Sequence, residues 1–367
     1  MCGIFGAVSS LSIQQDLIHG LSMLEYRGYD SAGLSIISNS KKIKRIRCTG
    51  KVNALKRLLA SSKLQGSCGI AHTRWATHGV PNLKNSHPHN YGRFSIVHNG
   101  IIENSDDIKN FLLQKYHKFS SDTDSEVIVH LLEYFSNKHN KLSKILLNTF
   151  KKLRGSFALG IIYDGQPDQI IVASNGSPIL IGLGKDANYI SSDIHALASK
   201  TKKYISLEDN EFGIIKKDSF ELFNISGKKI NRKPFITKQN QNTVSKNGYK
   251  HFMQKEIFEQ KDIIARVIKD KIGSSKILPN IFGPKSDQML KSIKHVHFVA
   301  CGTSYNASLV AKYWIEEVSD IMCTAEIASE YRYRTINIPK DTLFVAISQS
   351  CLLYTSPSPR DKRQSRM

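Results

Sequence analysis

The 367-residue chain carries 52 Lys and Arg residues against 31 Asp and Glu residues, which gives a formal net charge of +21. A strongly basic chain can bind nucleic acid, but here the basic residues are spread along the whole sequence and no nucleic-acid-binding motif accompanies them. We therefore interpret the charge as a solvated basic surface and expect no nucleic-acid partner.

Chain length and the distribution of cysteines narrow the class of protein further. The length suggests two or three domains. No apolar run approaches the roughly 18–20 residues of a membrane span, and the N-terminus lacks the pattern of a signal peptide, so we expect a cytoplasmic protein without a membrane partner. The cysteines are scattered without metal-binding spacing, which argues against structural disulfides and zinc. They are Cys2, Cys48, Cys68, Cys301, Cys323 and Cys351.

The rest of the chain is organised around its first residues, Met1-Cys2-Gly3-Ile4-Phe5-Gly6. If Met1 is removed, Cys2 carries a thiol and a free α-amine, which is a nucleophile and a proton acceptor in one residue. Their ordinary pKa values, about 8.5 and about 7.7–8.0, make proton transfer between them easy near neutrality. The alternative is an ordinary cysteine at a frayed terminus, but an apolar strand begins at once after it.

Downstream, helical spacing predicts a helix over residues 11–26, followed by a strand at 34–37, a helix at 52–59 and a strand ending near His72. The next segment, Thr73 to Gly79, gathers an arginine, an indole, two hydroxyls and an imidazole. Arg74 could grip a carboxylate bidentately, and Trp75 could wall a pocket or gate a passage. The alternatives are a surface charge and a core anchor.

Two further segments carry candidate chemistry. His87 and His89 bracket a proline without a partner carboxylate, so we expect no metal site there. A strand over 94–98 runs into Asn99-Gly100, which is a turn signal and also a possible oxyanion site, because an Asn amide and a Gly N–H can point at one oxygen. His98 is interpreted as a core histidine.

Asp124 precedes a predicted helix at 127–135 and is either a first-turn carboxylate favoured by the helix dipole or a buried partner for an ammonium group. Strands predicted at 156–163, 169–173, 179–183 and 189–191 complete a helix-and-sheet domain over residues 2–220. Residues 221–285 are expected to form a polar linker and a connecting helix from Phe252 to about Lys269.

A second domain is predicted over 286–350. A strand at 295–300 runs into Cys301-Gly302-Thr303-Ser304 and a helix, and a strand at 343–347 ends in Ser348-Gln349-Ser350. Two hydroxyl-rich strand ends in one parallel sheet would meet at one crevice and favour a phosphorylated small molecule; helix N-caps are the alternative. Residues 351–367 are Pro-, Ser- and Arg-rich and are expected to be foreign to the fold.

Taken together, these segments resemble a known family. The chain resembles the class II glutamine amidotransferases in residues 1–6, 25–33, 73–79, 98–100 and 123–124. Residues 254–257, 300–305, 328–334 and 348–350 narrow the resemblance to the glutamine–fructose-6-phosphate aminotransferases, which form amino sugars. The resemblance covers residues 1–350.

The resemblance implies a fold and a set of roles. The fold is an α+β N-terminal-nucleophile αββα sandwich followed by an incomplete α/β sugar-isomerase sandwich. Cys2 attacks the glutamine carboxamide with its own α-amine as base, Asn99 and Gly100 hold the oxyanion, and no cofactor is implied. The remaining implied residues are Arg74, Thr77, His78 and Asp124 for glutamine, Trp75 for the gate of an ammonia channel, and Thr303, Ser304, Ser348, Gln349 and Ser350 for the sugar phosphate.

One departure limits this expectation. The family continues after Ser350 with Gly-Glu-Thr, whereas this chain has Cys351, Leu352 and Leu353, and the family's isomerase residues lie beyond that point. We therefore expect glutamine hydrolysis without synthesis of glucosamine 6-phosphate from fructose 6-phosphate, although the complete family enzymes do both and are usually homo-oligomeric. The alternatives are an inactive sugar-phosphate-binding module and another class II amidotransferase.

Overall fold

The computed structural model of this chain describes residues 2–60, 62, 64–75, 80–236, 248–269, 286–331 and 333–348. The chain divides into two compact units, residues 1–244 and residues 245–367.

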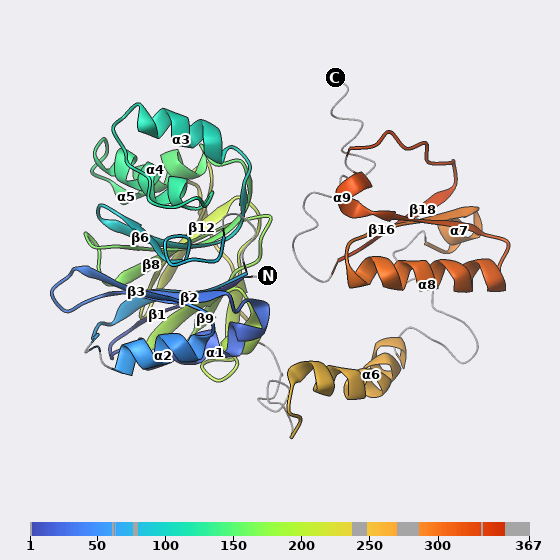
Figure 1. The fold of residues 1–367 in the computed structure, drawn as a ribbon, viewed down its shortest axis with the longest axis horizontal. Coiled ribbons are helices and arrows are strands. Elements are labelled where there is room, and N and C mark those ends of the chain that lie inside the picture. The colour runs from blue at the N-terminus through green and yellow to red at the C-terminus, as the bar shows by residue number, and fades with distance from the viewer. Residues whose placement is uncertain are drawn as a thin grey trace. The chain divides into compact units, whose positions relative to one another are not determined.

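Two stacked antiparallel sheets form the first unit (Figure 1). One sheet has eight strands in the order β15-β11-β9-β10-β1-β4-β2-β3. Its strands are β1 (Gly3–Ser9), β2 (Ser31–Ile37), β3 (Ile43–Thr49), β4 (Cys68–Arg74), β9 (Leu180–Leu183), β10 (Ala187–Ser191), β11 (Lys203–Ser206) and β15 (Phe235–Ile236). The first strand of the chain therefore lies inside the sheet, between β4 and β10.

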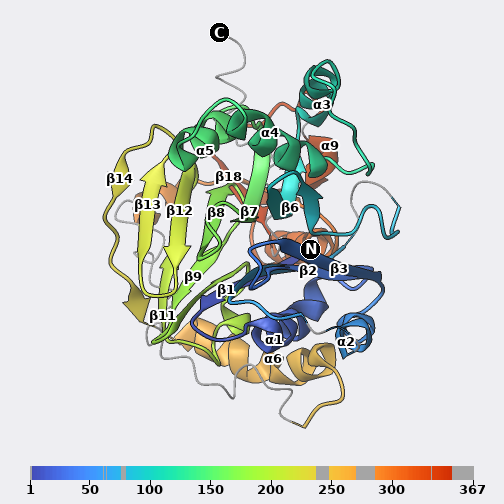
Figure 2. The same cartoon turned by 90° about the vertical axis from the view of Figure 1, so that its left-hand side faces the viewer.

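The facing sheet has seven strands in the order β14-β13-β12-β8-β7-β6-β5. They are β5 (His89–Tyr91), β6 (Phe94–Ile102), β7 (Gly155–Tyr163), β8 (Gln169–Asn175), β12 (Glu211–Lys216), β13 (Phe220–Asn224) and β14 (Lys229–Ile230). Helices α3 (Ser105–Leu113), α4 (Glu126–Ser136) and α5 (Leu142–Phe150) cover its outer face, whereas α1 (Gln14–Leu24) and α2 (Val52–Ala60) cover the outer face of the first sheet (Figure 2). Short 3₁₀ turns lie at Glu25–Arg27 and Ile194–Ala196.

The four layers follow from the two-residue period of the strands. On β1, Phe5 and Ala7 pack toward α1, whereas Ile4 and Val8 join the core between the two sheets. A third apolar cluster joins the second sheet to α3, α4 and α5. Three apolar layers hold four layers of backbone together, so the expected αββα sandwich is confirmed.

The structure differs from the sequence expectations in places. Asn99-Gly100 forms no turn, because β6 continues through both residues and stays paired with β7 as far as Ile102. The boundary expected at residue 220 falls inside paired strands, since β13 pairs with β12 and β15 pairs with β11. These late strands belong to the first unit, although their segment is polar enough to suggest a linker.

The second unit holds α6 (Phe252–Lys269), α7 (Ser286–Lys291), α8 (Thr303–Val318) and α9 (Ala328–Tyr331). Its sheet is parallel, in the order β17-β16-β18, with β16 (His295–Ala300) between β17 (Met322–Ile327) and β18 (Thr342–Ile347). The chain leaves β16 to one side and returns on the other, so β16 marks a topological switch point. Among the described residues, no helix combines the length and apolar character needed to cross a bilayer.

Gly20 tests the packing of α1 on β1. A Cβ atom at Gly20 would lie 2.3–2.6 Å from ring atoms of Phe5, which is fully buried. A Gly-to-Ala change inside a helix normally stabilises by about 1 kcal/mol, but here we expect Gly20→Ala to lower the free energy of unfolding by about 1–3 kcal/mol through overpacking. Denaturant unfolding measures the change, with the exposed Gln15→Ala on the same helix as control. A variant as stable as the parent would contradict this packing.

Candidate active site

Cys2 lies just before β1 and is held beside the end of β4. The register pairs Gly3 with Thr73, so the chain after Thr73 passes the Cys2 side chain. The Trp75 backbone N–H donates to Cys2 Sγ at 3.3 Å, and Sγ lies 3.5 Å from the Trp75 carbonyl oxygen. Burial raises the pKa of the Cys2 thiol, and this effect exceeds the lowering by the Trp75 backbone and nearby positive charge. The thiol therefore needs a proton acceptor before it can attack.

Asn99 faces the nucleophile residue in a fixed orientation. Its Nδ2 donates to the Cys2 carbonyl oxygen at 3.1 Å. Its Oδ1 lies 3.0 Å from His72 Nε2, which is also 3.0 Å from the His98 carbonyl oxygen. Because both partners are acceptors, His72 Nε2 carries the hydrogen, and the Asn99 amide must present its NH₂ group toward Cys2.

Gly100, the second candidate oxyanion residue, tolerates no side chain. Its φ is +130°, and a Cβ atom there would lie 2.1 Å from the Ser156 carbonyl oxygen. Only glycine meets both conditions. The strand pairing that fixes Gly100 opposite Phe157 also fixes Asn99 opposite Ala158.

Arg74 is the last residue of β4, and Asp124 lies in the turn before α4. Arg74 is buried and follows His72 by two residues on β4. Asp124 accepts from the Ile102 backbone N–H at 2.8 Å, which ties it to the end of β6 three residues beyond Asn99. Asp124 therefore does not cap α4 with its carboxylate.

The other residues expected to surround the substrate are only partly covered by the structure. Trp75 is 46% exposed and packs edge-to-face on Tyr29, with ring centroids 5.2 Å apart. Thr77 and His78 lie outside the described residues. Arg27 was not singled out from the sequence beyond its place in a family motif, yet its Nε donates to the Cys2 carbonyl oxygen at 3.1 Å.

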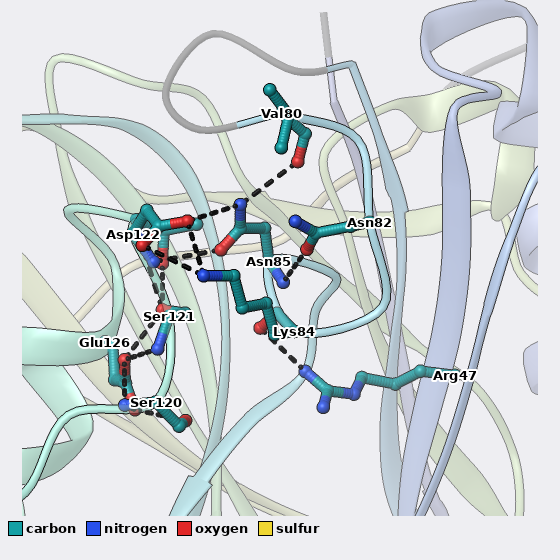
Figure 3. Close-up of polar contacts among 10 residues, drawn as sticks. Arg47, Val80, Asn82, Lys84, Asn85, Ser120, Ser121, Asp122 and Glu126 are labelled. Atoms are coloured by element: carbon teal, nitrogen blue, oxygen red, sulfur yellow. Dashed lines mark hydrogen bonds and ion pairs between the residues drawn. The ribbon is translucent and has the colours of Figure 1, made fainter.

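A polar network joins the segment after Gly79 to the segment before α4 (Figure 3). Asn85 is fully buried, and its Nδ2 donates to the Val80 carbonyl oxygen at 3.0 Å and to Asp122 Oδ2 at 3.3 Å. In return, the Asp122 backbone N–H donates to Asn85 Oδ1 at 2.9 Å. The exposed Lys84 adds an ion pair to Asp122 at 3.0 Å. These contacts hold the chain at Asp122, two residues before Asp124.

Glu126 closes the same network from the helix side. Ser121 donates to it through its backbone N–H at 2.6 Å and its hydroxyl at 2.7 Å, and Ser120 contributes equivalent contacts. Burial alone would raise the pKa of Glu126, but hydrogen bonds from His130, Ser120 and Ser121 hold it well below its usual range. The carboxylate therefore stays charged and keeps the turn before α4 rigid.

Buried histidine rings pack behind His72. His87 lies 4.2 Å from the His72 ring and 4.6 Å from the His89 ring, measured between centroids. Burial lowers the pKa of His72 to about 3, that of His89 to about 3, and that of His87 well below its usual value. The rings are neutral at physiological pH. His98, expected to be a core histidine, is also buried and lies 2.8 Å from the Ser125 hydroxyl through Nδ1.

In the second unit, the predicted hydroxyl residues come to one edge of the sheet. Thr303 and Ser304 begin α8 directly after β16, and Ser348 follows the adjacent β18. Because the strands are parallel, these residues meet at their carboxyl ends. Gly302 has a φ of +59° and makes the turn into α8. Gln349 and Ser350 lie outside the described residues.

Comparison with known proteins assigns both units. A family model described as a glutamine amidotransferase domain matches residues 72–199, and one described as a SIS domain matches residues 289–351. The chain is 42% identical over 95% of its length to proteins named glutamine–fructose-6-phosphate aminotransferase [isomerizing] from Pseudomonas aeruginosa and Buchnera aphidicola. It spans 57% and 58%, respectively, of the length of these relatives.

Solved structures show the same fold. A Bacillus subtilis glutamine phosphoribosylpyrophosphate amidotransferase matches with a TM-score of 0.55 at 22% identity, over 92% of this chain and 69% of that chain. A structure titled as the allosteric regulatory enzyme of purine biosynthesis matches with a TM-score of 0.54 at 26% identity, over 61% of this chain and 49% of that chain.

The buried histidines predict acid sensitivity. A histidine whose folded pKa lies below its unfolded value of about 6.5 binds fewer protons when folded, so stability falls as pH drops below about 6.5. Between pH 7 and pH 5, we expect His72, His87 and His89 each to remove on the order of 1–2 kcal/mol from the free energy of unfolding. Carboxylates contribute little in this window because their unfolded pKa lies near about 4.

Urea unfolding at pH 5, 6 and 7 measures this slope. His87 is the residue to change, because neither of its ring nitrogens has a hydrogen-bond partner among the described residues. His87→Leu should flatten the pH dependence without large loss of stability at pH 7. A slope equal to that of the parent would show that His87 does not remain neutral when folded.

Proposed function

Because the chain belongs to the family of the glutamine–fructose-6-phosphate aminotransferases, we propose that its first unit hydrolyses the side-chain amide of glutamine with Cys2 as nucleophile. The observation that carries this proposal is the Asn99 amide, which is locked by His72 so that its NH₂ group lies against Cys2. Such an arrangement suits an acyl transfer, in which negative charge develops on an oxygen beside the nucleophile.

The chemistry proceeds in two steps. After loss of Met1, the Cys2 α-amine takes the thiol proton as Sγ attacks the amide carbon. One hydrogen of Asn99 Nδ2 stays on the Cys2 carbonyl oxygen, and the other is available to the oxyanion together with the Gly100 N–H. The α-amine then protonates the leaving nitrogen, ammonia departs, and a γ-glutamyl thioester remains. Water, deprotonated by the same amine, attacks the thioester carbon; the C–S bond breaks, the amine returns the proton to Cys2 Sγ, and glutamate leaves.

Substrate recognition uses the charges near Cys2. Arg74 pairs with the α-carboxylate of glutamine and Asp124 with its α-ammonium group. Thr77 and His78, which lie outside the described residues, are proposed to bind the same substrate. Arginine forms a fork that matches a carboxylate. Such ion pairs would favour a free amino acid over a peptide, whose amide-linked ends carry neither charge.

For the whole protein, we propose that the released ammonia aminates fructose 6-phosphate to give glucosamine 6-phosphate, with Trp75 gating its passage. Thr303, Ser304 and Ser348, with Gln349 and Ser350 beyond the described residues, would hold the sugar phosphate. Free N–H groups at the start of α8 and the positive end of its dipole favour a phosphate at that edge.

The test of the first half-reaction begins with the intact mass of the purified protein, which should lack Met1. Ammonia release from glutamine should then fall more than about 1,000-fold in Cys2→Ser. The matched control is Cys301→Ser, an exposed cysteine of the second unit, which should keep the parental rate. Retained ammonia release in Cys2→Ser would show that Cys2 is not the nucleophile, whereas no covalent labelling of Cys2 by a glutamine-like electrophile would favour an inactive binding module.

Asn85 should affect substrate binding more than chemistry. In Asn85→Ala, the Asp122 N–H and the Val80 carbonyl lose their buried partner, so the segment carrying Asp124 loosens. We expect KM for glutamine to rise about 5- to 30-fold, as for a loss of about 1–2 kcal/mol of binding, with kcat within about 3-fold of the parent.

Steady-state kinetics with Lys84→Met provides the control for Asn85→Ala. This change removes an exposed ion pair to the same carboxylate, and exposed pairs contribute little to stability. A KM change in Lys84→Met as large as that in Asn85→Ala would show that the effect comes from the charge pairing of Asp122 and not from the buried hydrogen bonds of Asn85.

A further inference from the structure

We propose that Asp193 is a positioning residue for the Cys2 nucleophile and acts through Arg27 without touching the substrate. The inference rests on the proposed function, since it concerns the same site. No feature of the sequence singled out Asp193, which follows β10 in a segment remote from Cys2 along the chain.

Asp193 gathers donors from three residues. Its Oδ2 accepts from Arg27 Nη1 at 2.9 Å and from the Tyr26 hydroxyl at 2.5 Å. Its Oδ1 accepts from the His195 backbone N–H at 2.9 Å and contacts His195 Nδ1 at 2.8 Å. The ion pair is largely shielded, with 11% of the Arg27 side chain and 15% of the Asp193 side chain exposed. A shielded carboxylate with this many donors holds one fixed orientation.

Arg27 links the fixed Asp193 carboxylate to the backbone of Cys2. Its Nη1 bonds Asp193, and its Nε donates to the Cys2 carbonyl oxygen at 3.1 Å, on which Asn99 Nδ2 also converges. The guanidinium group is planar, so fixing Nη1 fixes the direction of Nε. Once Met1 is lost, Cys2 is attached through one peptide bond only. Its carbonyl oxygen is then the atom by which the protein sets where the α-amine and Sγ point.

The backbone around Asp193 is itself fastened to β1. The Ser192 N–H donates to the Ile4 carbonyl oxygen at 3.0 Å, and the Ile4 N–H donates to Ser192 Oγ at 3.0 Å. The pairing of Ser191 with Phe5 continues this connection into the sheet. Asp193 and the nucleophile thus share one rigid frame, whereas Arg27 reaches them from the 3₁₀ turn at the end of α1.

The hydrogen bond between Tyr26 and Asp193 persists near neutral pH, because neither group changes its protonation state there. Burial would raise the pKa of Asp193, but hydrogen bonds from His195 and Tyr26 lower it far below its usual range. Burial and the hydrogen bond to Asp193 raise the pKa of Tyr26 to about 12. Asp193 therefore remains an anion and Tyr26 remains a donor near neutral pH.

The test compares Asp193→Asn with the parent in glutamine hydrolysis and in labelling of Cys2 by a glutamine-like electrophile. We expect kcat and the labelling rate at saturation to fall about 10- to 100-fold, as for misaligned reacting groups, with KM within about 3-fold. The matched control is Glu211→Gln, which disrupts a similarly buried carboxylate paired with Arg232 at 2.7 Å. It should lower the thermal midpoint without changing the labelling rate per folded molecule.

A double-mutant cycle separates positioning through Arg27 from a merely structural role. Asp193→Asn and Arg27→Lys should each slow labelling, and the double variant should be no slower than the slower single variant. Additive losses, or a parental rate in folded Asp193→Asn, would overturn the inference. If Asp193→Asn does not fold, Tyr26→Phe replaces it in the cycle with an expected loss of about 2- to 5-fold, and no loss there overturns the inference.

The two proposals fail in different ways. If the parent protein neither hydrolyses glutamine nor is labelled at Cys2, the proposed function fails and the positioning role falls with it. If the parent is active and the cycle is additive, only the role of Asp193 fails.

Discussion

The pairing of β1 on both of its edges is the constraint on which the site depends. Chain termini are usually frayed, and a nucleophile there would lose its alignment to thermal motion. Here the ladder to β4 and the ladder to β10 begin within a few residues of Cys2. The carbonyl oxygen of Cys2 then takes two further hydrogen bonds, from Asn99 and Arg27. Cys2, the proposed nucleophile at the start of the chain, is thereby held as firmly as a residue inside the fold.

The site also requires that the two sheets be held in one fixed position relative to each other, because each contributes residues to it. His72 from the first sheet bonds Asn99 from the second, and this is a direct polar link between the two sheets. A buried imidazole is costly unless it is neutral and bonded, which explains why the ring donates to two carbonyl oxygens. The Asn99 amide is thus oriented by the core. The core in turn needs Gly100, because the backbone beside Asn99 approaches Ser156 too closely for a side chain.

Much of this could be predicted because the signals are local. Strand periodicity gave β16 with its observed bounds and most of β1, and the residue types around Cys2, Arg74 and Asn99 indicated the chemistry. The dipeptide Asn99-Gly100 favours turns in isolation, so the sequence left a turn and an oxyanion site both open; the nine residues of β6 that pair with β7 exclude the turn. Asp193 could not be found, since its role arises from β10 pairing with β1, a contact between segments far apart in sequence.

The late strands make the same point about domain boundaries. Residues after Phe220 are polar and short in apolar pattern, which is typical of linkers. β13 nevertheless pairs with β12, and Arg232 reaches back to Glu211 at 2.7 Å. Edge strands need little apolar surface of their own, because backbone hydrogen bonds and one shielded ion pair hold them to a sheet that already has a core. Amino-acid composition indicates how much apolar surface a segment can bury, and an edge strand buries little. The end of such a unit is therefore set by strand pairing, which composition does not reveal.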